Sequence, residues 1–194
     1  DKNVVVGLHV VLYSILSTTK KYIKIYILYK EYSTLDKNNL FQTLSCFDGS
    51  YEVVFYEVDD SVFSHCKGLY GNTYAFVRLL IPDYIEESRV IYVDTDVVFN
   101  IDVDDLYRQD IDNFIIGAAT FVNVSQSRDG KFFESLGMNG NSPYFNSGIM
   151  LIDLDGWRRN NITGKCIEFV SMYGDEIRVA DETVLNVIFH DNFK

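Results

Sequence analysis

Two aspartates, Asp94 and Asp96, follow directly after an apolar run, Arg89 to Val93, that has the composition of a buried strand. Residues two apart on an extended backbone point to the same side, so both carboxylates are expected to face one way. These carboxylates repel each other, and no Lys or Arg follows in the next ten residues. A hard divalent cation, with water and a diphosphate as its other ligands, would remove this repulsion. The spacing therefore predicts a metal site.

The alternative for Asp94 and Asp96 is an acidic turn that is simply solvated. A bare Asp-x-Asp sequence favours that alternative. Here apolar residues stand on both sides, with Val97-Val-Phe99 after the motif. Ligands of open α/β sheets also gather at the carboxyl ends of the strands. The context favours the metal site.

A second polar group, Asn146-Ser147-Gly148, precedes the apolar run Ile149 to Ile152. We predict a turn that leads into a buried strand. Gly148 allows close backbone approach, and Asn146 can donate and accept hydrogen bonds to sugar hydroxyls. An ordinary turn before a strand is the open alternative.

Two further features combine charge with helical context. Asp181 and Glu182 stand at the start of a predicted helix, where Asp181 could bind a ligand or cap the helix. Arg78 lies within an apolar helix, so it is predicted either to contact a ligand or to form an ion pair.

The elements that must position these residues alternate between helix and strand, which predicts an α/β fold with a largely parallel sheet. Asn3 is expected to cap the first helix. The expected helices are 3–17, one around 40–47, 73–81 (stopped near Pro82), 165–173 and 182–189. The expected strands are 23–28, 53–58, 89–93, 114–119 and 148–152.

Composition limits the possible partners. The chain has 194 residues and a formal net charge of -11, which disfavours a DNA or RNA partner. No run of about 18 apolar residues is present, so no membrane span is predicted. Cys46, Cys66 and Cys166 lack metal-ligand spacing. The length suits one domain.

In this order, the segments resemble the family 8 retaining glycosyltransferases, which include glycogenin and the bacterial lipopolysaccharide galactosyl- and glucosyltransferases. The matching segments are Asp1-Lys-Asn3 with the helix ending Leu12-Tyr-Ser-Ile-Leu16, residues 23–29, Phe76-Val-Arg-Leu-Leu-Ile-Pro82, 89–99, the loop Val103-Asp-Asp-Leu106, Phe145-Asn-Ser-Gly148 through Trp157, and Asp181 to Asn186.

The resemblance implies a GT-A fold, with a Rossmann-like mixed sheet flanked by helices in a single domain spanning 1–194. It also implies a UDP-sugar donor, with glucose or galactose as the hexose, and Mn²⁺ or Mg²⁺ bound by Asp94 and Asp96. The donor contacts it implies are Asp1, Asn3, Arg78, Thr95, Ser147 and Gly148. The residues it places around the reacting sugar, as catalytic groups, are Asn146, Asp181 and Glu182.

Three features depart from the family pattern. Family members usually have a strand before the Asp-x-Asn loop, whereas residues 1–194 start at that loop, which suggests a trimmed or partly ordered chain or a naturally short member. The family's third metal ligand, a histidine in a His-x-x-Gly-x-Lys-Pro-Trp-like segment, is expected beyond Lys194. His190 does not match that segment and is predicted to be a surface residue. Glu182 stands where the family usually has Gln.

The predicted function is transfer of a hexose, with retention, to a glycan, a lipid-linked or a protein acceptor. One alternative is a nucleotide-sugar-binding module without turnover. The other is a phosphohydrolase of the haloacid dehalogenase type, whose Asp-x-Asp normally lies near the N-terminus. A bacterial source would imply the cytoplasm, and a eukaryotic one the Golgi or ER lumen.

Overall fold

The computed structural model describes residues 4–47, 49–64, 66 and 73–194. Contacts divide the chain into two compact units. The first unit comprises Asp1–Asp59 and Val93–Asp110, and the second comprises Asp60–Tyr92 and Ile111–Lys194. Across the described residues, no helix is long and apolar enough to cross a bilayer.

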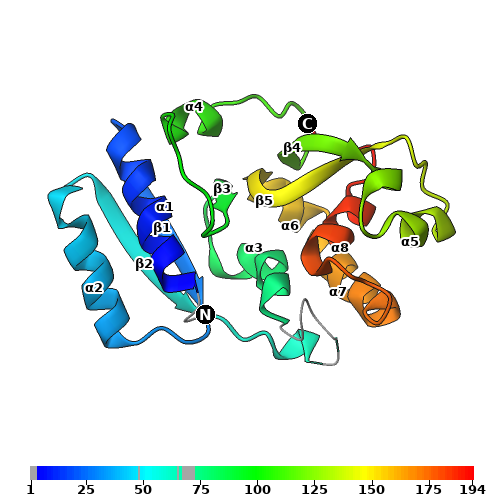
Figure 1. Ribbon diagram of the computed structural model, residues 1–194, viewed down its shortest axis with the longest axis horizontal. Coiled ribbons are helices and arrows are strands. Elements are labelled where there is room, and N and C mark those ends of the chain that lie inside the picture. Colours follow the sequence, from blue (N-terminus) through cyan, green and yellow to red (C-terminus); the bar gives the residue numbers. More distant parts are fainter. Residues whose placement is uncertain (1–3, 48, 65, 67–72) are drawn as a thin grey trace. The chain divides into compact units, whose positions relative to one another are not determined.

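The first unit pairs two parallel strands, in register from Ile23 opposite Tyr51 to Tyr29 opposite Glu57. Helices α1 and α2 pack against each other (Figure 1). α2 begins with a capping box, in which Ser33 and Asp36 exchange side-chain and backbone hydrogen bonds. The elements are α1 (Val5–Thr18), β1 (Ile23–Tyr29), α2 (Thr34–Leu44), the 3-10 turn η2 (Ser45–Phe47), β2 (Tyr51–Glu57) and α4 (Val103–Tyr107).

Helix α1 holds the Asp-x-Asp segment of the same unit at two points. A Cβ atom at Gly7 would collide with the backbone carbonyl oxygen of Thr95, so the helix and this segment are in direct backbone contact. Seven residues further along α1, Ser14 Oγ accepts a hydrogen bond of 2.9 Å from Phe99 N–H. The position of the segment is therefore set by packing against α1.

The second unit contains a three-stranded sheet in the order β3-β5-β4 (Figure 1). β5 pairs antiparallel with β4, from Ile116 opposite Ile152 to Asn123 opposite Pro143. The elements are η3 (Ser61–Phe63), η4 (Thr73–Leu80), α3 (Ile81–Tyr84), β3 (Arg89–Val93), β4 (Ile116–Asn123), η5 (Val124–Gln126), α5 (Gly130–Ser135), β5 (Pro143–Asp153), α6 (Leu154–Arg159), α7 (Ile162–Tyr173) and α8 (Ala180–Ile188).

Helix α8 lies at the centre of the second unit, in contact with β5, α7 and the 3-10 helix η4. Its buried residues include apolar Val184 and Leu185 as well as polar Asp181, Thr183 and Asn186. The second unit also contains a core of aromatic and aliphatic side chains. The largest fully buried members of this core are Phe63, Phe76, Leu79, Ile116, Phe133, Phe145, Met150, Ile152, Trp157 and Phe189. η4, β5 and α8 are thereby fixed against one another.

The structure corrects three expectations about the elements. β5 begins at Pro143, not at Gly148, because Tyr144 and Phe145 are already buried and paired with β4. The expected helix 73–81 is the 3-10 helix η4, which ends at Leu80, and Pro82 lies in the first turn of the separate helix α3, where its missing N–H costs nothing. Residues 103–106, expected as a loop, belong to α4, whose N-cap Asp102 accepts a hydrogen bond from Asp104 N–H.

The contact at Gly7 gives a stability prediction. Gly→Ala inside a helix normally stabilises by about 1 kcal/mol. Gly7→Ala is instead expected to destabilise by about 1–3 kcal/mol, because its methyl group cannot enter the backbone contact with Thr95 without a shift. Urea unfolding followed by circular dichroism measures the change.

Gly164→Ala in α7 is the matched control, because the three atoms nearest to its methyl group all belong to the exposed Asn161 side chain, which can move away. This variant is expected to be as stable as wild type or more so. A stabilising Gly7→Ala substitution would contradict the proposed contact between α1 and the Asp-x-Asp segment.

Candidate active site

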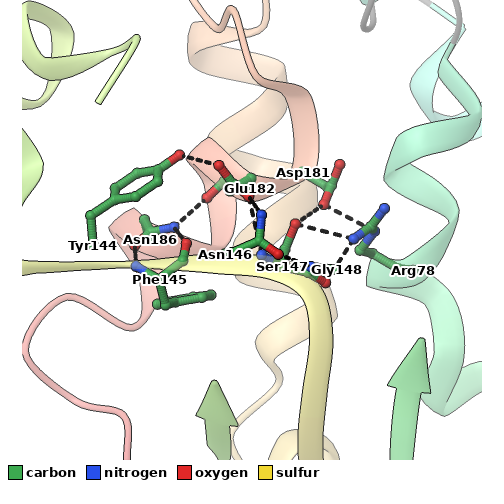
Figure 2. A network of polar contacts seen from close by, with 9 residues as sticks. All are labelled: Arg78, Tyr144, Phe145, Asn146, Ser147, Gly148, Asp181, Glu182 and Asn186. Carbon is green, nitrogen blue, oxygen red and sulfur yellow. Dashed lines mark hydrogen bonds and ion pairs between the residues drawn. The ribbon is translucent and has the colours of Figure 1, made fainter. Parts of the chain in front are cut away.

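Strand β5, helix α8 and the 3-10 helix η4 bring six of the predicted site residues together in the second unit (Figure 2). These six are Arg78 from η4, Asn146, Ser147 and Gly148 from β5, and Asp181 and Glu182 from the first turn of α8. Residues distant in the sequence thus form one continuous polar network.

Arg78 and Asp181 form a buried ion pair. Arg78 Nε lies 2.9 Å from Asp181 Oδ2, and their side chains are 11% and 5% exposed. Arg78 Nη1 also donates to Ser147 O at 2.8 Å and to Ser147 Oγ at 3.1 Å. The Ser147 hydroxyl donates onward to Asp181 Oδ2 at 3.0 Å. The guanidinium stacks over the Tyr92 ring, 4.5 Å from its centroid.

The Glu182 carboxylate accepts three hydrogen bonds from neutral donors. Tyr144 Oη–H donates to Oε1 at 2.7 Å, while Asn146 Nδ2 and Ser147 N–H donate to Oε2 at 3.0 and 3.1 Å. Asn146 also accepts from Gly148 N–H at 3.0 Å. The side chain of Glu182 is therefore fixed in orientation, and Asn146 is the exposed member of the group.

Burial raises the pKa of the Tyr144 phenol far above its usual range, and the neighbouring Glu182 carboxylate raises it further. Tyr144 therefore stays protonated and acts as the donor to Glu182. The phenol is held in place by packing of its ring against Phe133, with 5.8 Å between the ring centroids.

Asn186, which was not expected to belong to the site, joins α8 to β5. Its side chain accepts from Phe145 N–H at 3.0 Å and donates to Phe145 O and to Glu182 O, each at 2.9 Å. An asparagine one helical turn after Glu182, among apolar neighbours, was the available sequence signal. Tyr144 and Tyr92 were not expected to belong to the site either.

The structure decides between several of the open alternatives. Asp181 does not cap α8, whose N-cap is Val179. Arg78 is an ion-pair partner, and its contact with a donor stays a prediction. Residues 146–148 lie within β5, so the predicted turn is wrong. His190 lies just after α8, partly exposed.

The Asp-x-Asp motif lies in the first unit, immediately after the last residue of β3. Thr95 and Asp96 form a turn, so the alternation expected of an extended strand ends at Val93, where the strand itself ends. Asp94 is half-buried and Asp96 exposed. Their association with the network of the second unit stays a prediction. Asp1 and Asn3 lie outside the described residues.

The donor set of Asp94 and Asp96 fits a hard divalent cation, since carboxylate oxygens are the ligands that Mg²⁺ and Mn²⁺ prefer. Within the described part of the chain, no group of three or more His, Cys, Asp or Glu could hold a metal. The two aspartates would therefore supply only part of a coordination sphere, and an oxygen-rich ligand would complete it.

A solved structure with the same fold identifies the fold class of this chain. The galactosyltransferase LgtC, solved in complex with donor and acceptor sugar analogues, matches with a TM-score of 0.82 and 24% identity, over 96% of this chain and 67% of its own. The chain therefore has the α/β GT-A fold with a mixed sheet, as predicted.

The sequence profile described as glycosyl transferase family 8 matches residues 1–194, and the chain belongs to this family. A putative glycosyltransferase of Haemophilus influenzae is 32% identical over 189 residues, which are 93% of this chain and 54% of the relative. General stress protein A of Bacillus subtilis is 29% identical over 147 residues, 73% of this chain and 50% of the relative. The chain thus spans about half the length of these relatives.

The buried ion pair gives a second stability prediction. Arg78→Leu is expected to destabilise by about 3 kcal/mol, because it leaves the Asp181 carboxylate buried without its cation. Adding Asp181→Asn should recover part of that loss, since the uncompensated charge is then removed. Urea unfolding of the single and double variants measures both effects.

Arg108→Leu is the control, because Arg108 pairs with Asp104 at 2.8 Å but is 63% exposed. Exposed pairs contribute only about 0–1 kcal/mol. Equal losses for the two arginine variants would argue that burial of the Arg78–Asp181 pair is unimportant.

Proposed function

We propose that this chain forms the donor-binding and catalytic part of a retaining glycosyltransferase that uses a UDP-sugar. The hexose, glucose or galactose, is transferred to a carbohydrate, a lipid-linked glycan or a protein acceptor. The observation that carries the proposal is the fixed pair of acidic residues, Asp181 and Glu182, in a chain that matches glycosyl transferase family 8 over its whole length.

The network suits a site that orients a sugar. Arg78 and Ser147 bind Asp181 Oδ2, which fixes the orientation of the carboxylate. Asn146 is exposed between buried neighbours on β5, and its amide has a second N–H and a second oxygen lone pair, beyond those that bind Glu182 and Gly148, for hydroxyls of a bound sugar. A rigid constellation of this kind lowers the barrier by holding the reactants in a productive orientation.

The chemistry of the proposed transfer needs one bond made and one broken at the anomeric carbon. The acceptor oxygen bonds to that carbon from the face that the diphosphate leaves, and the acceptor proton passes to a diphosphate oxygen. A Mn²⁺ or Mg²⁺ ion held by Asp94 and Asp96 would stabilise the charge that builds on the leaving diphosphate. Asp1, Asn3, Thr95 and Gly148 complete the proposed donor contacts.

Glu182 is proposed to act by charge and position. The ion pair with Arg78 neutralises the negative charge of Asp181. The three donors to Glu182 are uncharged: a phenol, an amide and a backbone N–H. A net negative charge therefore remains on Glu182 and can stabilise an oxocarbenium-like centre. Since three hydrogen bonds already engage its oxygens, Glu182 is poorly disposed to attack as a nucleophile.

The first functional prediction is metal-dependent donor use. Uridine diphosphate should bind, and UDP-sugars should be turned over, only with Mn²⁺ or Mg²⁺ present, because a diphosphate is repelled by a chain of net charge -11. Calorimetric titration and a UDP-release assay, with and without chelator, measure this. Asp94→Asn and Asp96→Asn should each weaken both readouts.

A generic phosphatase substrate, assayed in parallel, separates the competing functions. Donor binding without turnover would favour a binding module, and hydrolysis of the phosphatase substrate would favour a phosphohydrolase. Equal affinity for uridine diphosphate in chelator would remove the proposed metal role.

The second functional prediction is that Glu182→Gln retains a substantial part of the turnover. The amide oxygen can accept from Asn146 and Ser147 as Oε2 does, and the new NH₂ can donate to Tyr144, whose hydroxyl then accepts. The shape of the network is preserved. Steady-state kinetics with the best donor measures the effect, and Asp181→Asn, which breaks a buried ion pair, should be worse.

A Glu182→Gln variant without turnover, together with a sugar attached to Glu182 of the wild type in intact-mass spectrometry, would contradict this role. A double displacement through a covalent glycosyl-enzyme would then replace it.

A further inference from the structure

A buried carboxylate outside the predicted site, Asp129, binds the segment that leads into α8. Its Oδ2 accepts from the backbone N–H of Arg178 at 3.1 Å and of Val179 at 3.3 Å, and from the hydroxyl of Thr183. Asp129 is 2% exposed. Its Oδ1 is buried and has no hydrogen-bond partner among the described residues.

The three donors lie on both sides of a strained residue. Ala180 has φ +47°, the left-handed region that residues with a side chain rarely adopt. Such a conformation costs on the order of 1–3 kcal/mol and persists only where the surroundings hold it. The N-cap of α8, Val179, also has no polar side chain of its own. The Asp129 carboxylate accepts hydrogen bonds at this helix start, where the N-cap residue has no side-chain acceptor.

Asp181 and Glu182 are the two residues that follow Ala180, so the backbone held by Asp129 sets the direction of both side chains. Thr183, the next residue, is completely buried and donates its hydroxyl to the same oxygen. A shift of this turn would move the partner of Arg78 and the acceptor of Tyr144 together.

The segment that carries Asp129 supports the site by a second route. Val124 and Phe133, on either side of Asp129, form a buried cluster with Tyr144. Directly after Asp129, a Cβ atom at Gly130 would lie 3.0 Å from Ser125 O, so the chain there is tightly packed. One rigid segment therefore holds both the phenol that binds Glu182 and the turn from which Glu182 projects.

The geometry points to Asp129 as a positioning residue for the transfer reaction. By holding residues 178–183 in their strained conformation, it fixes Asp181 and Glu182 against the sugar without touching it. This inference rests on the proposed function. A carboxylate that served only to cap a helix would affect stability and leave turnover per folded molecule unchanged.

The test compares kcat, KM and folded fraction of the full-length protein in a UDP-release assay with Mn²⁺. Asp129→Ala should lower kcat by about 100-fold with little change in the KM for the donor, because misplaced groups act mainly on the reacting centre. Asp129→Asn should restore most of kcat, since its amide oxygen can accept from the same three donors.

Asp153→Ala is the matched control. Asp153 is also an aspartate cap, accepting from Gly156 N–H at 2.9 Å, but it serves α6. Its loss should lower stability and leave kcat unchanged. Should Asp129→Ala fail to fold, Thr183→Val removes one donor at nearly constant volume and should lower kcat in the same direction. Faster amide exchange at Arg178 and Val179 should accompany each kinetic loss.

The outcomes separate the two proposals. If the wild type turns over a UDP-sugar and the folded Asp129→Ala and Thr183→Val variants have the same kcat as the wild type, the positioning role alone is overturned. Equal kinetic losses in Asp129→Ala and Asp153→Ala would also overturn it. Absence of turnover in the wild type with every UDP-sugar would overturn the proposed function, and the positioning role with it.

Discussion

The ion pair between Arg78 and Asp181 is the interaction on which the second unit depends. Two charges withdrawn from water are strongly destabilising unless each finds its partners, and here Ser147 and the Tyr92 ring complete the set. The participants come from η4, β3, β5 and α8, so the pair forms only when these elements have assembled. In the folded chain, the ion pair and its hydrogen bonds to Ser147 hold the polar side chains of β5 against the start of α8.

Much of the fold followed from local patterns. The apolar runs that became β1, β2 and β3, and the periodicity of α1 and α8, depend on residues close in sequence, and the structure has them at nearly the expected bounds. Other elements differed more, and β5 differed for a reason that lies outside its own segment. Asn146 and Ser147 are typical turn residues, and only their partners on α8 and the strand pairing with β4 explain why the backbone there is extended.

Six members of the polar network were predicted from the sequence, but neither their connections nor the other members were. Arg78 stood out within an apolar helix, Asn146 in a polar group before an apolar run, and Asp181 and Glu182 as acidic residues at the start of a helix. Tyr144, Asn186 and Asp129 were missed because each looks ordinary in its own segment and acquires its role from a partner 38 to 54 positions away. A single sequence does not show which distant residues such hydrogen bonds join, even where, as at Asn186, a polar residue stands among apolar ones.

The hydroxyl of Tyr144 has a consequence for how this site can change over time. A hydroxyl can donate to a carboxylate or accept from an amide by rotating one bond. Glutamate and glutamine codons differ by one base, so a lineage could pass between them at position 182 without a compensating substitution nearby. A lysine or arginine in place of the tyrosine would close that path. Because of the phenol, the charge at position 182 can change under selection while the residues around it stay the same.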